Sequence, residues 1–192
     1  RVMNYCLNTS ERGKLFKPRR TCKLEDIANF EFIIDGYSDS DYAKDTVKRR
    51  SVSGFCCFLE GCPLNTKSRM QPITALSVTE AELIAATECA QDLLFAKHIL
   101  ESIGLKVRTH MVLNIDNSGC IDLICNWSAG GRTRHMETRM YYLRELKEQE
   151  PPIVMPIYCP TTLNRSDIFT KNCETILFDE HVQAFCTDEP FG

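Results

Sequence analysis

A chain of 192 residues with 43% hydrophobic composition is long enough for one globular domain with a buried core. Its net charge of -3 does not mark a strongly basic nucleic-acid binder, and its 11 cysteines include no CxxC pair of the kind that holds zinc. No signal peptide opens the chain and no apolar run approaches the roughly 20 residues that span a bilayer, so we expect an intracellular, cytoplasmic protein without a membrane partner.

The first part of the chain predicts a basic entry segment and three strands. Lys and Arg dominate the segment before residue 24, which is compatible with a phosphate-bearing partner or with a solvated face. An apolar β-type run covers 30–38, and two more strands, 51–61 and 62–69, are joined by a turn around Gly61. This hairpin spacing predicts antiparallel pairing.

The middle of the chain predicts a long helix over 77–104. Ser77 and Glu80 match a capping box, and Gly104 supplies the stop. Its apolar positions recur at helical spacing: Leu83, Ala86, Ala90, Leu93 and Leu100. A buried strand over 109–115 and a short helix over 118–127 follow.

The last part of the chain predicts a charged helix over 134–150, a strand over 153–160 and a final helical stretch. Asn164 is its expected cap, with Leu163 and Ile168 as a hydrophobic staple. Three strands followed by alternating helices and strands indicate an α/β domain whose mixed sheet combines an antiparallel meander with crossover units.

Four carboxylates follow or face this predicted sheet. Asp39 ends the first strand and Asp116 ends the strand after the long helix, so the two meet if those strands are neighbours. Glu82 lies in the first helical turn on the apolar face, and Asp167 follows the expected cap Asn164. Four converging carboxylates need a cation, and such hard oxygen ligands select Mg²⁺ or Mn²⁺.

Structural roles also account for single acids. Asp116 fits an N-cap, and Asp167 fits a helix N3 residue. Glu80 is a capping residue, and we expect Asp35, Asp41 and Asp45 to face solvent or the turn. Spacing alone leaves both interpretations open.

The chain resembles the ribonuclease H domain of copia-type LTR retrotransposon Pol polyproteins. The resemblance rests on "GYSDSDYAKD", "SVTEAEL", "IDNSGC", "RTRHMETRMYYLREL" and "NRSDIFTK", which occur in the family's order. The resemblance as a whole extends over nearly the whole chain. It implies a ribonuclease H-like fold with a mixed five-stranded sheet flanked by helices. Residues 1–28 would be a remnant of the reverse transcriptase region and 29–192 the ribonuclease H domain.

The resemblance also implies a function. The family cuts the RNA strand of RNA–DNA hybrids with two Mg²⁺ ions, for which Mn²⁺ substitutes. Its catalytic and metal-binding acids match Asp39, Glu82, Asp116 and Asp167. The implied partners are the hybrid and the reverse transcriptase domain of the same polyprotein, within retrotransposon particles.

Basic side chains are candidates for the substrate contacts, although each one taken alone is more typical of solvated surface. They are Arg49, Arg50, Lys67, Arg69, Arg134 and His135. An integrase or transposase on the same fold is disfavoured, because those enzymes usually place their glutamate last. A decayed or domesticated domain that binds nucleic acid or supports a polymerase is the non-enzymatic alternative.

Overall fold

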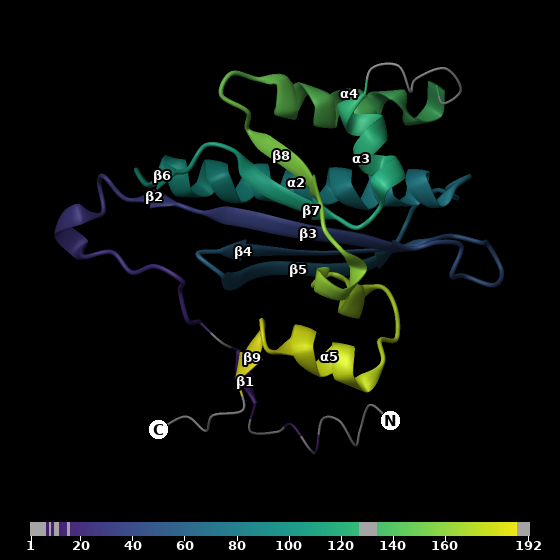
Figure 1. The fold of residues 1–192 in the computed structure, drawn as a ribbon, viewed down its shortest axis with the longest axis horizontal. Helices are drawn as coiled ribbons and strands as arrows, with labels where there is room; N and C mark the ends of the chain where they lie inside the picture. The colour runs from purple at the N-terminus through teal and green to yellow at the C-terminus, as the bar shows by residue number, and fades with distance from the viewer. Residues whose placement is uncertain (1–6, 8, 10–11, 15, 127–133, 188–192) are drawn as a thin grey trace.

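A five-stranded sheet forms the centre of the computed structural model, which describes residues 7, 9, 12–14, 16–126 and 134–187 (Figure 1). The strand order is β5-β4-β3-β7-β8. β3 pairs antiparallel with β4, and β4 with β5, whereas β7 runs parallel to both β3 and β8. This confirms the expected meander followed by crossovers. The strands are β3 (Ile34–Asp41), β4 (Val52–Leu59), β5 (Cys62–Met70), β7 (Met111–Ile115) and β8 (Val154–Tyr158).

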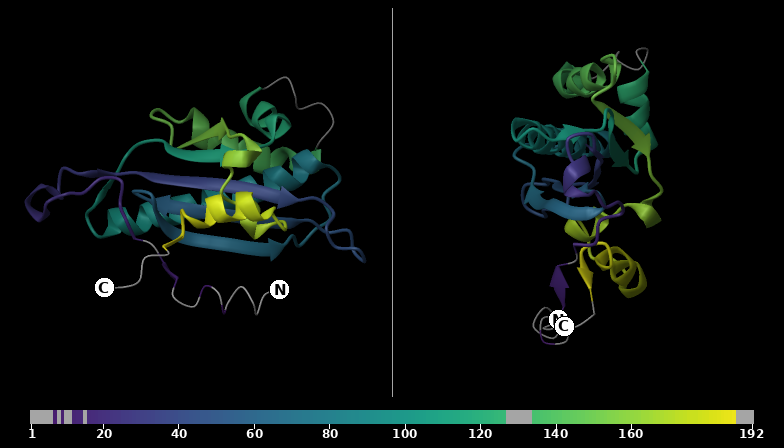
Figure 2. Two further views of the ribbon diagram at one scale, coloured as in Figure 1. Left: turned by 60° about the horizontal axis from the view of Figure 1, so that its bottom comes forward. Right: turned by 90° about the vertical axis from the view of Figure 1, so that its left-hand side faces the viewer.

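Helices cover both faces of the sheet (Figure 2). One face carries α2 (Val78–Ser102), α3 (Ser118–Cys125) and α4 (Arg134–Glu148), and the other carries the 3₁₀ turn η4 (Asp167–Phe169) and α5 (Thr175–Val182). Short elements complete the fold: β1 (Gly13–Lys14), η1 (Leu24–Asp26), β2 (Glu31–Phe32), β6 (Lys106–Val107), η3 (Thr161–Leu163) and β9 (Cys186–Thr187). β1 pairs with β9, and β2 with β6.

The main core lies between α2 and the sheet. Leu83, Ala86, Ala90 and Leu93 are fully buried, so the predicted apolar face of the helix is the face that packs on β3, β4 and β7. Each fully buried leucine contributes about 1.5–3 kcal/mol relative to an exposed one. No helix in the described part of the chain is both long enough and apolar enough to cross a membrane.

The predicted ends of α2 are confirmed. The Ser77 hydroxyl accepts a hydrogen bond from the Glu80 amide at 3.1 Å, and the Glu80 carboxylate accepts from the Leu76 amide at 2.6 Å. Two amide donors at the helix start are thereby satisfied. At the other end, Gly104 adopts a φ of 83°, which ends the helix in a conformation that favours glycine.

The expectation that Asn164 caps the final helical stretch is wrong. Asn164 instead ends η3, and a separate turn, η4, precedes α5. The Asn164 side-chain nitrogen donates to the Ser38 carbonyl at 2.9 Å, while its side-chain oxygen accepts from the Ser166 amide at 3.2 Å. These bonds tie the segment to β3, so Asn164 anchors a turn and does not cap a helix.

The expectation for the three acids near β3 is partly wrong. Asp35 is 6% exposed, and the basic segment before β2 brings a guanidinium nitrogen of Arg19 to 3.9 Å from its carboxylate. Asp41 pairs with Lys44, and the Asp45 carboxylate accepts from the Lys48 amide at 2.6 Å. Asp41 and Asp45 thus lie in or beside the turn, as predicted, whereas Asp35 is buried.

A glycine lets η4 lie close to the sheet. A Cβ added at Gly54 of β4 would lie 2.5 Å from Thr170 Cγ2 and 3.0 Å from Phe169 Cβ. The neighbouring strand supports the same approach, since the Ser68 hydroxyl donates to the Phe169 carbonyl at 2.5 Å. No larger side chain fits at Gly54 unless the segment around η4 moves.

We therefore predict that Gly54→Ala lowers the free energy of unfolding by about 1–3 kcal/mol, because overpacking strains both β4 and the turn. Urea denaturation followed by circular dichroism measures this. Gly119→Ala is the milder comparison and should cost less, since its added Cβ would lie 3.2 Å from the nearest atoms, on the side chains of Asn117 and Thr79. Equal stability of Gly54→Ala and the parent chain would contradict the close packing described.

Candidate metal centre

Three of the four predicted acids meet at one end of the sheet. Asp39 lies near the end of β3, Asp116 directly follows β7, and Glu82 projects from the first turns of α2. One carboxylate oxygen of each lies within 4.8 Å of the others. Because β3 and β7 are parallel neighbours, their carboxyl ends bring Asp39 and Asp116 together, and α2 packs against β3.

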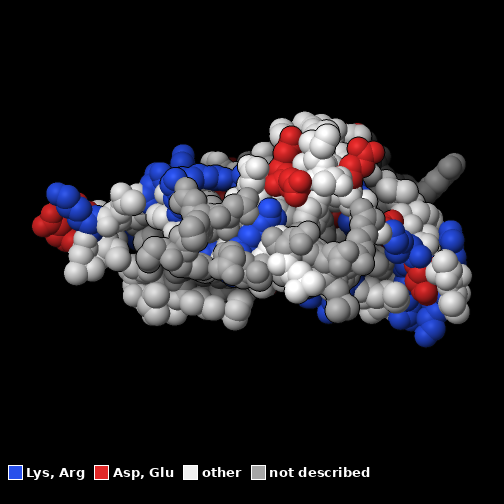
Figure 3. Space-filling model, turned by 90° about the horizontal axis from the view of Figure 1, so that it is seen from below, with Lys and Arg blue, Asp and Glu red and all other residues white. Residues whose placement is uncertain are grey.

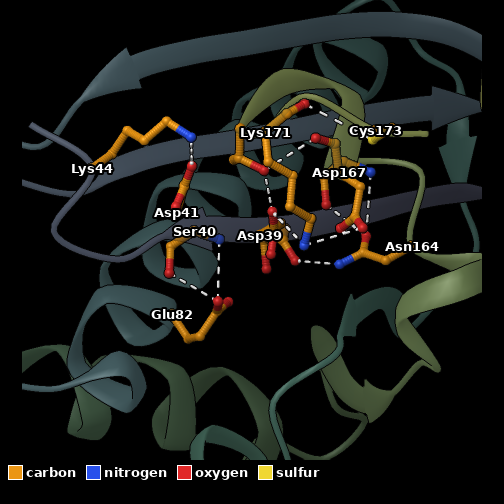
Figure 4. Close-up of polar contacts among 12 residues, drawn as sticks. Asp39, Ser40, Asp41, Lys44, Glu82, Asn164, Asp167, Lys171 and Cys173 are labelled. Atoms are coloured by element: carbon orange, nitrogen blue, oxygen red, sulfur yellow. Dashed lines mark hydrogen bonds and ion pairs between the residues drawn. The ribbon is translucent and has the colours of Figure 1, made fainter. Parts of the chain in front are cut away.

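Glu82 is fixed by Ser40 of β3. Its Oε1 accepts hydrogen bonds from the Ser40 amide at 3.1 Å and from the Ser40 hydroxyl at 2.8 Å (Figure 4). Its Oε2 is buried and accepts no hydrogen bond from the described residues. One oxygen of this carboxylate therefore orients the side chain, and the other is available to a ligand.

Asp167 lies beside Asp39, at the start of η4, and is linked to it by Lys171. The Lys171 ammonium is 3.1 Å from Asp167 Oδ2 and 3.6 Å from Asp39 Oδ2 (Figure 4). Asp167 is fully buried. The structure thus gathers all four predicted acids, three in a tight group and Asp167 next to them.

Sequence reasoning missed two residues of this site. The Thr170 hydroxyl donates a hydrogen bond to Asp39 Oδ2, the oxygen that Lys171 also approaches. Thr170 and Lys171 follow Asp167 by three and four residues, which is one helical turn. The periodicity of the "DIFTK" stretch was the signal that could have identified them.

The capping alternatives for two of the acids are not supported. Asn117, not Asp116, caps α3, since its side chain accepts from the Cys120 amide at 2.8 Å. Neither carboxylate oxygen of Asp167 accepts a hydrogen bond from an amide of the described residues, so Asp167 satisfies no helix amide there. Neither acid is explained by helix capping.

Burial and mutual repulsion disfavour the charged forms of these acids. Burial first, and then the charge of Asp39, raises the pKa of Asp167 to about 7, although Lys171 lowers it. The pKa of Glu82 is raised well above its ordinary value by burial and by Asp39 and Asp116. Burial and Asp39 likewise raise the pKa of Asp116. The group carries more negative charge than its surroundings compensate.

The donor set fits a hard divalent cation. Carboxylate oxygens from three elements converge, and the buried Glu82 Oε2 and Asp167 Oδ1 have no hydrogen-bond donor among the described residues. Oxygen ligands of this kind suit Mg²⁺ and Mn²⁺. Asp39, Glu82 and Asp116 could hold such an ion, with Asp167 beside it.

The predicted substrate contacts fall into three groups. Arg49 and Arg50 lie in the loop between β3 and β4, at the end of the molecule where Lys and Arg side chains gather on the right in Figure 3. Lys67 and Arg69 on β5 approach Glu88 of α2 at 3.7 and 2.9 Å, so part of their charge is already compensated. The side chains of Arg134 and His135 lie outside the described residues.

The raised pKa of Asp167 has a consequence for stability. With a folded pKa of about 7 against an ordinary 3.8, the folded chain holds the proton that the unfolded chain releases. We predict that the metal-free protein loses about 2–4 kcal/mol of stability from this group as pH rises from about 4 to 7. Urea denaturation with chelator, at pH 5 and pH 8, measures the loss.

Asp167→Asn should flatten this pH dependence and make the metal-free protein more stable at pH 8 than the parent chain. Asp122→Asn, which changes an exposed carboxylate on α3, is the matched control and should keep the parent profile. A parent chain that is more stable at pH 8 than at pH 5 without metal would contradict the prediction.

Sequence comparison finds relatives among transposon polyproteins, although no family model matches the chain. It is 35% identical over 139 residues, 72% of its length, to the retrovirus-related Pol polyprotein from transposon TNT 1-94 of Nicotiana tabacum. It is 24% identical over 178 residues, 93% of its length, to that from transposon RE2 of Arabidopsis thaliana. The chain spans only 10% and 11% of these polyproteins.

Structure comparison identifies the fold. The chain is similar to LC11-RNase H1, solved in complex with an RNA/DNA hybrid, with a TM-score of 0.51 and 14% sequence identity. The match covers 71% of this chain and 93% of that one. The mixed five-stranded sheet with its helices is thus the ribonuclease H-like fold. The chain therefore has the ribonuclease H-like fold, and its sequence is similar to one part of the retrovirus-related Pol polyproteins of plant transposons.

Proposed function

We propose that this domain is a ribonuclease H that hydrolyses the RNA strand of RNA–DNA hybrids during reverse transcription of an LTR retrotransposon. The observation that carries the proposal is the convergence of Asp39, Glu82 and Asp116 within 4.8 Å, with Asp167 next to them. These residues come from four separate elements, so only a folded chain assembles them. We assign all four as the ligands of two Mg²⁺ ions, for which Mn²⁺ substitutes.

The chain's own residues prepare the site for this chemistry. Divalent ions held by these carboxylates would supply a nucleophilic water and stabilisation of the oxygens in an in-line phosphodiester displacement. Asp39 and Glu82 are oriented by hydrogen bonds from Thr170 and Ser40, so their carboxylates are already positioned when ions arrive. Preorganised ligands of this kind need no reorganisation during the reaction.

The relatives support the choice of substrate and partner. LC11-RNase H1 has been solved with an RNA/DNA hybrid, and the polyproteins similar in sequence are Pol polyproteins. We therefore propose the hybrid as substrate and a reverse transcriptase domain of the same polyprotein as partner. Residues 1–28 would then be the end of that neighbouring region.

The basic loop between β3 and β4 offers an approach for the hybrid. The loop follows Asp41 directly, so Arg49 and Arg50 are connected to the strand that carries Asp39. Arg49 is exposed and Arg50 half-exposed, as phosphate contacts require. With a net charge of -3, the domain depends on such local clusters to attract a polyanion, and its binding should be sensitive to salt.

A cleavage assay tests the proposed function. A hybrid labelled on each strand is incubated with the protein and Mg²⁺, Mn²⁺ or chelator. We predict metal-dependent loss of the RNA strand alone and at least about a 100-fold lower rate for Asp39→Asn, because a central ligand charge is removed. Asp122→Asn should keep the parent rate.

Two outcomes would contradict the proposal. If the folded parent chain bound the hybrid but left the RNA intact with either metal, the domain would be a nucleic-acid-binding module and not a nuclease. If Asp39→Asn cleaved the RNA strand at the parent rate, the carboxylate group around Asp39 would not be the source of the activity.

Hybrid affinity tests the basic loop separately. We predict that Arg49→Ala combined with Arg50→Ala weakens hybrid binding and reduces the slope of log K against log salt by about 1 for each arginine that binds a phosphate in the parent chain. Fluorescence anisotropy with chelator present measures both without cleavage. Arg108→Ala is the control, because Arg108 is exposed beside β6, at the other end of the molecule (Figure 1). An unchanged slope in the double variant would remove the loop from the substrate path.

A further inference from the structure

Lys171 places a positive charge among the carboxylates of the candidate metal centre. Its ammonium lies 3.1 Å from Asp167 and 3.6 Å from Asp39, on the Oδ2 atom of each. The two carboxylate side chains are 1% and 3% exposed, while the lysine side chain is 36% exposed. Figure 4 shows its stem descending from the segment after η4, so that the ammonium ends between them.

We propose that Lys171 is an internal counter-ion that occupies the position between Asp39 and Asp167 in the metal-free protein and must be displaced when a divalent ion binds there. The inference rests on the proposed function, because it concerns the same metal centre. It adds that the two metal positions are unequal. An ion enters the group of Asp39, Glu82 and Asp116 without competition, whereas an ion between Asp39 and Asp167 competes with the Lys171 ammonium.

The contacts explain why the two positions differ. In the group of Asp39, Glu82 and Asp116, the Glu82 Oε2 atom has no hydrogen-bond donor among the described residues. Lys171, in contrast, forms its ion pairs with Asp39 and Asp167. An ion held by Asp39 and Asp167 would instead need the position that the Lys171 ammonium occupies. Like charges so close repel strongly where water is excluded. The second ion therefore binds more weakly than the first.

The anchoring of the turn allows the lysine to leave alone. Thr170 bonds Asp39, Asn164 bonds the Ser38 carbonyl, and Ser68 bonds the Phe169 carbonyl, and none of these contacts involves Lys171. The lysine side chain is long and partly exposed, so its ammonium can move into water while the backbone of the turn stays in place. Displacement thus needs a side-chain rotation and leaves Asp167 where it is.

A merely structural lysine would behave in the opposite way. If Lys171 only held Asp167 in position, its removal would weaken metal binding, because the centre would lose a positioned ligand. If it competes with an ion, its removal strengthens binding of that ion. The direction of the change in affinity separates the two roles.

The test is a titration of the full chain with Mn²⁺ in the absence of nucleic acid. Calorimetry measures the heat of binding, and electron paramagnetic resonance measures the concentration of free Mn²⁺. We expect the parent chain to bind one Mn²⁺ more tightly than a second. Lys171→Met should bind the second ion about tenfold more tightly. The same variant, unfolded by urea with chelator, should be less stable than the parent chain, because the carboxylates lose their counter-ion.

Two controls accompany the variant. Lys171→Arg keeps the charge and should bind the second ion as weakly as the parent chain. Lys44→Met removes one positive charge that pairs with Asp41, outside the carboxylate group, and should change the second affinity less than about threefold. Together the two controls show whether the change in affinity for the second ion comes from competition with the Lys171 ammonium or from the change in the net charge of the protein.

The outcomes distinguish this inference from the proposed function. If the parent chain binds Mn²⁺ but Lys171→Met binds the second ion equally or more weakly, the counter-ion role is wrong while the metal centre stands. If no variant binds Mn²⁺, both are wrong. If Lys171→Met and Lys171→Gln fold only when Mn²⁺ is present, the ion replaces the missing positive charge and the counter-ion role is supported. If these variants fail to fold even with Mn²⁺, the counter-ion role is wrong.

Discussion

Electrostatic repulsion among buried carboxylates is the constraint on which the rest of this structure depends. Folding brings oxygens of Asp39, Glu82 and Asp116 within 4.8 Å, where their charged forms disfavour one another. The free energy that holds them there comes from elsewhere. The apolar face of α2 packs on β3, β4 and β7, and this burial fixes the elements that carry the acids.

Hydrogen bonds compensate the repulsion only in part. Ser40 satisfies one oxygen of Glu82, and Thr170 one oxygen of Asp39, but buried oxygens of Glu82 and Asp167 lack donors among the described residues. A protein selected for stability alone would not retain such acids, because unpaired buried charge is costly. The partial compensation orients the carboxylates and leaves the remaining oxygens to a cation, which is why stability and metal binding are coupled here.

Local patterns in the sequence predicted the part of the site that rests on regular elements. An apolar β-type run predicted the end of β3, a capping box predicted the first turns of α2, and a buried apolar run predicted the end of β7. The rule that ligands gather at the carboxyl ends of strands then predicted that Asp39 and Asp116 lie together. The segment around Asp167 was not predictable in this way. Asn164 resembled a helix cap, but its side chain donates to Ser38, 126 residues earlier. The ion pair of the buried Asp35 was missed for the same reason, since Arg19 approaches it from a separate segment that no local pattern connects to β3.

The turn that carries Asp167 has a consequence for the order in which the protein folds. The other three acids lie within residues 39–116, whereas the bonds that anchor the turn, from Asn164 to Ser38 and from Thr170 to Asp39, span 126 and 131 residues. Closing a loop of that length costs entropy before its contacts repay it, so we expect these contacts to form late. The sheet and α2 can assemble before the fourth carboxylate adds its charge. Repulsion at the centre thus reaches its full strength only after the core that withstands it has formed.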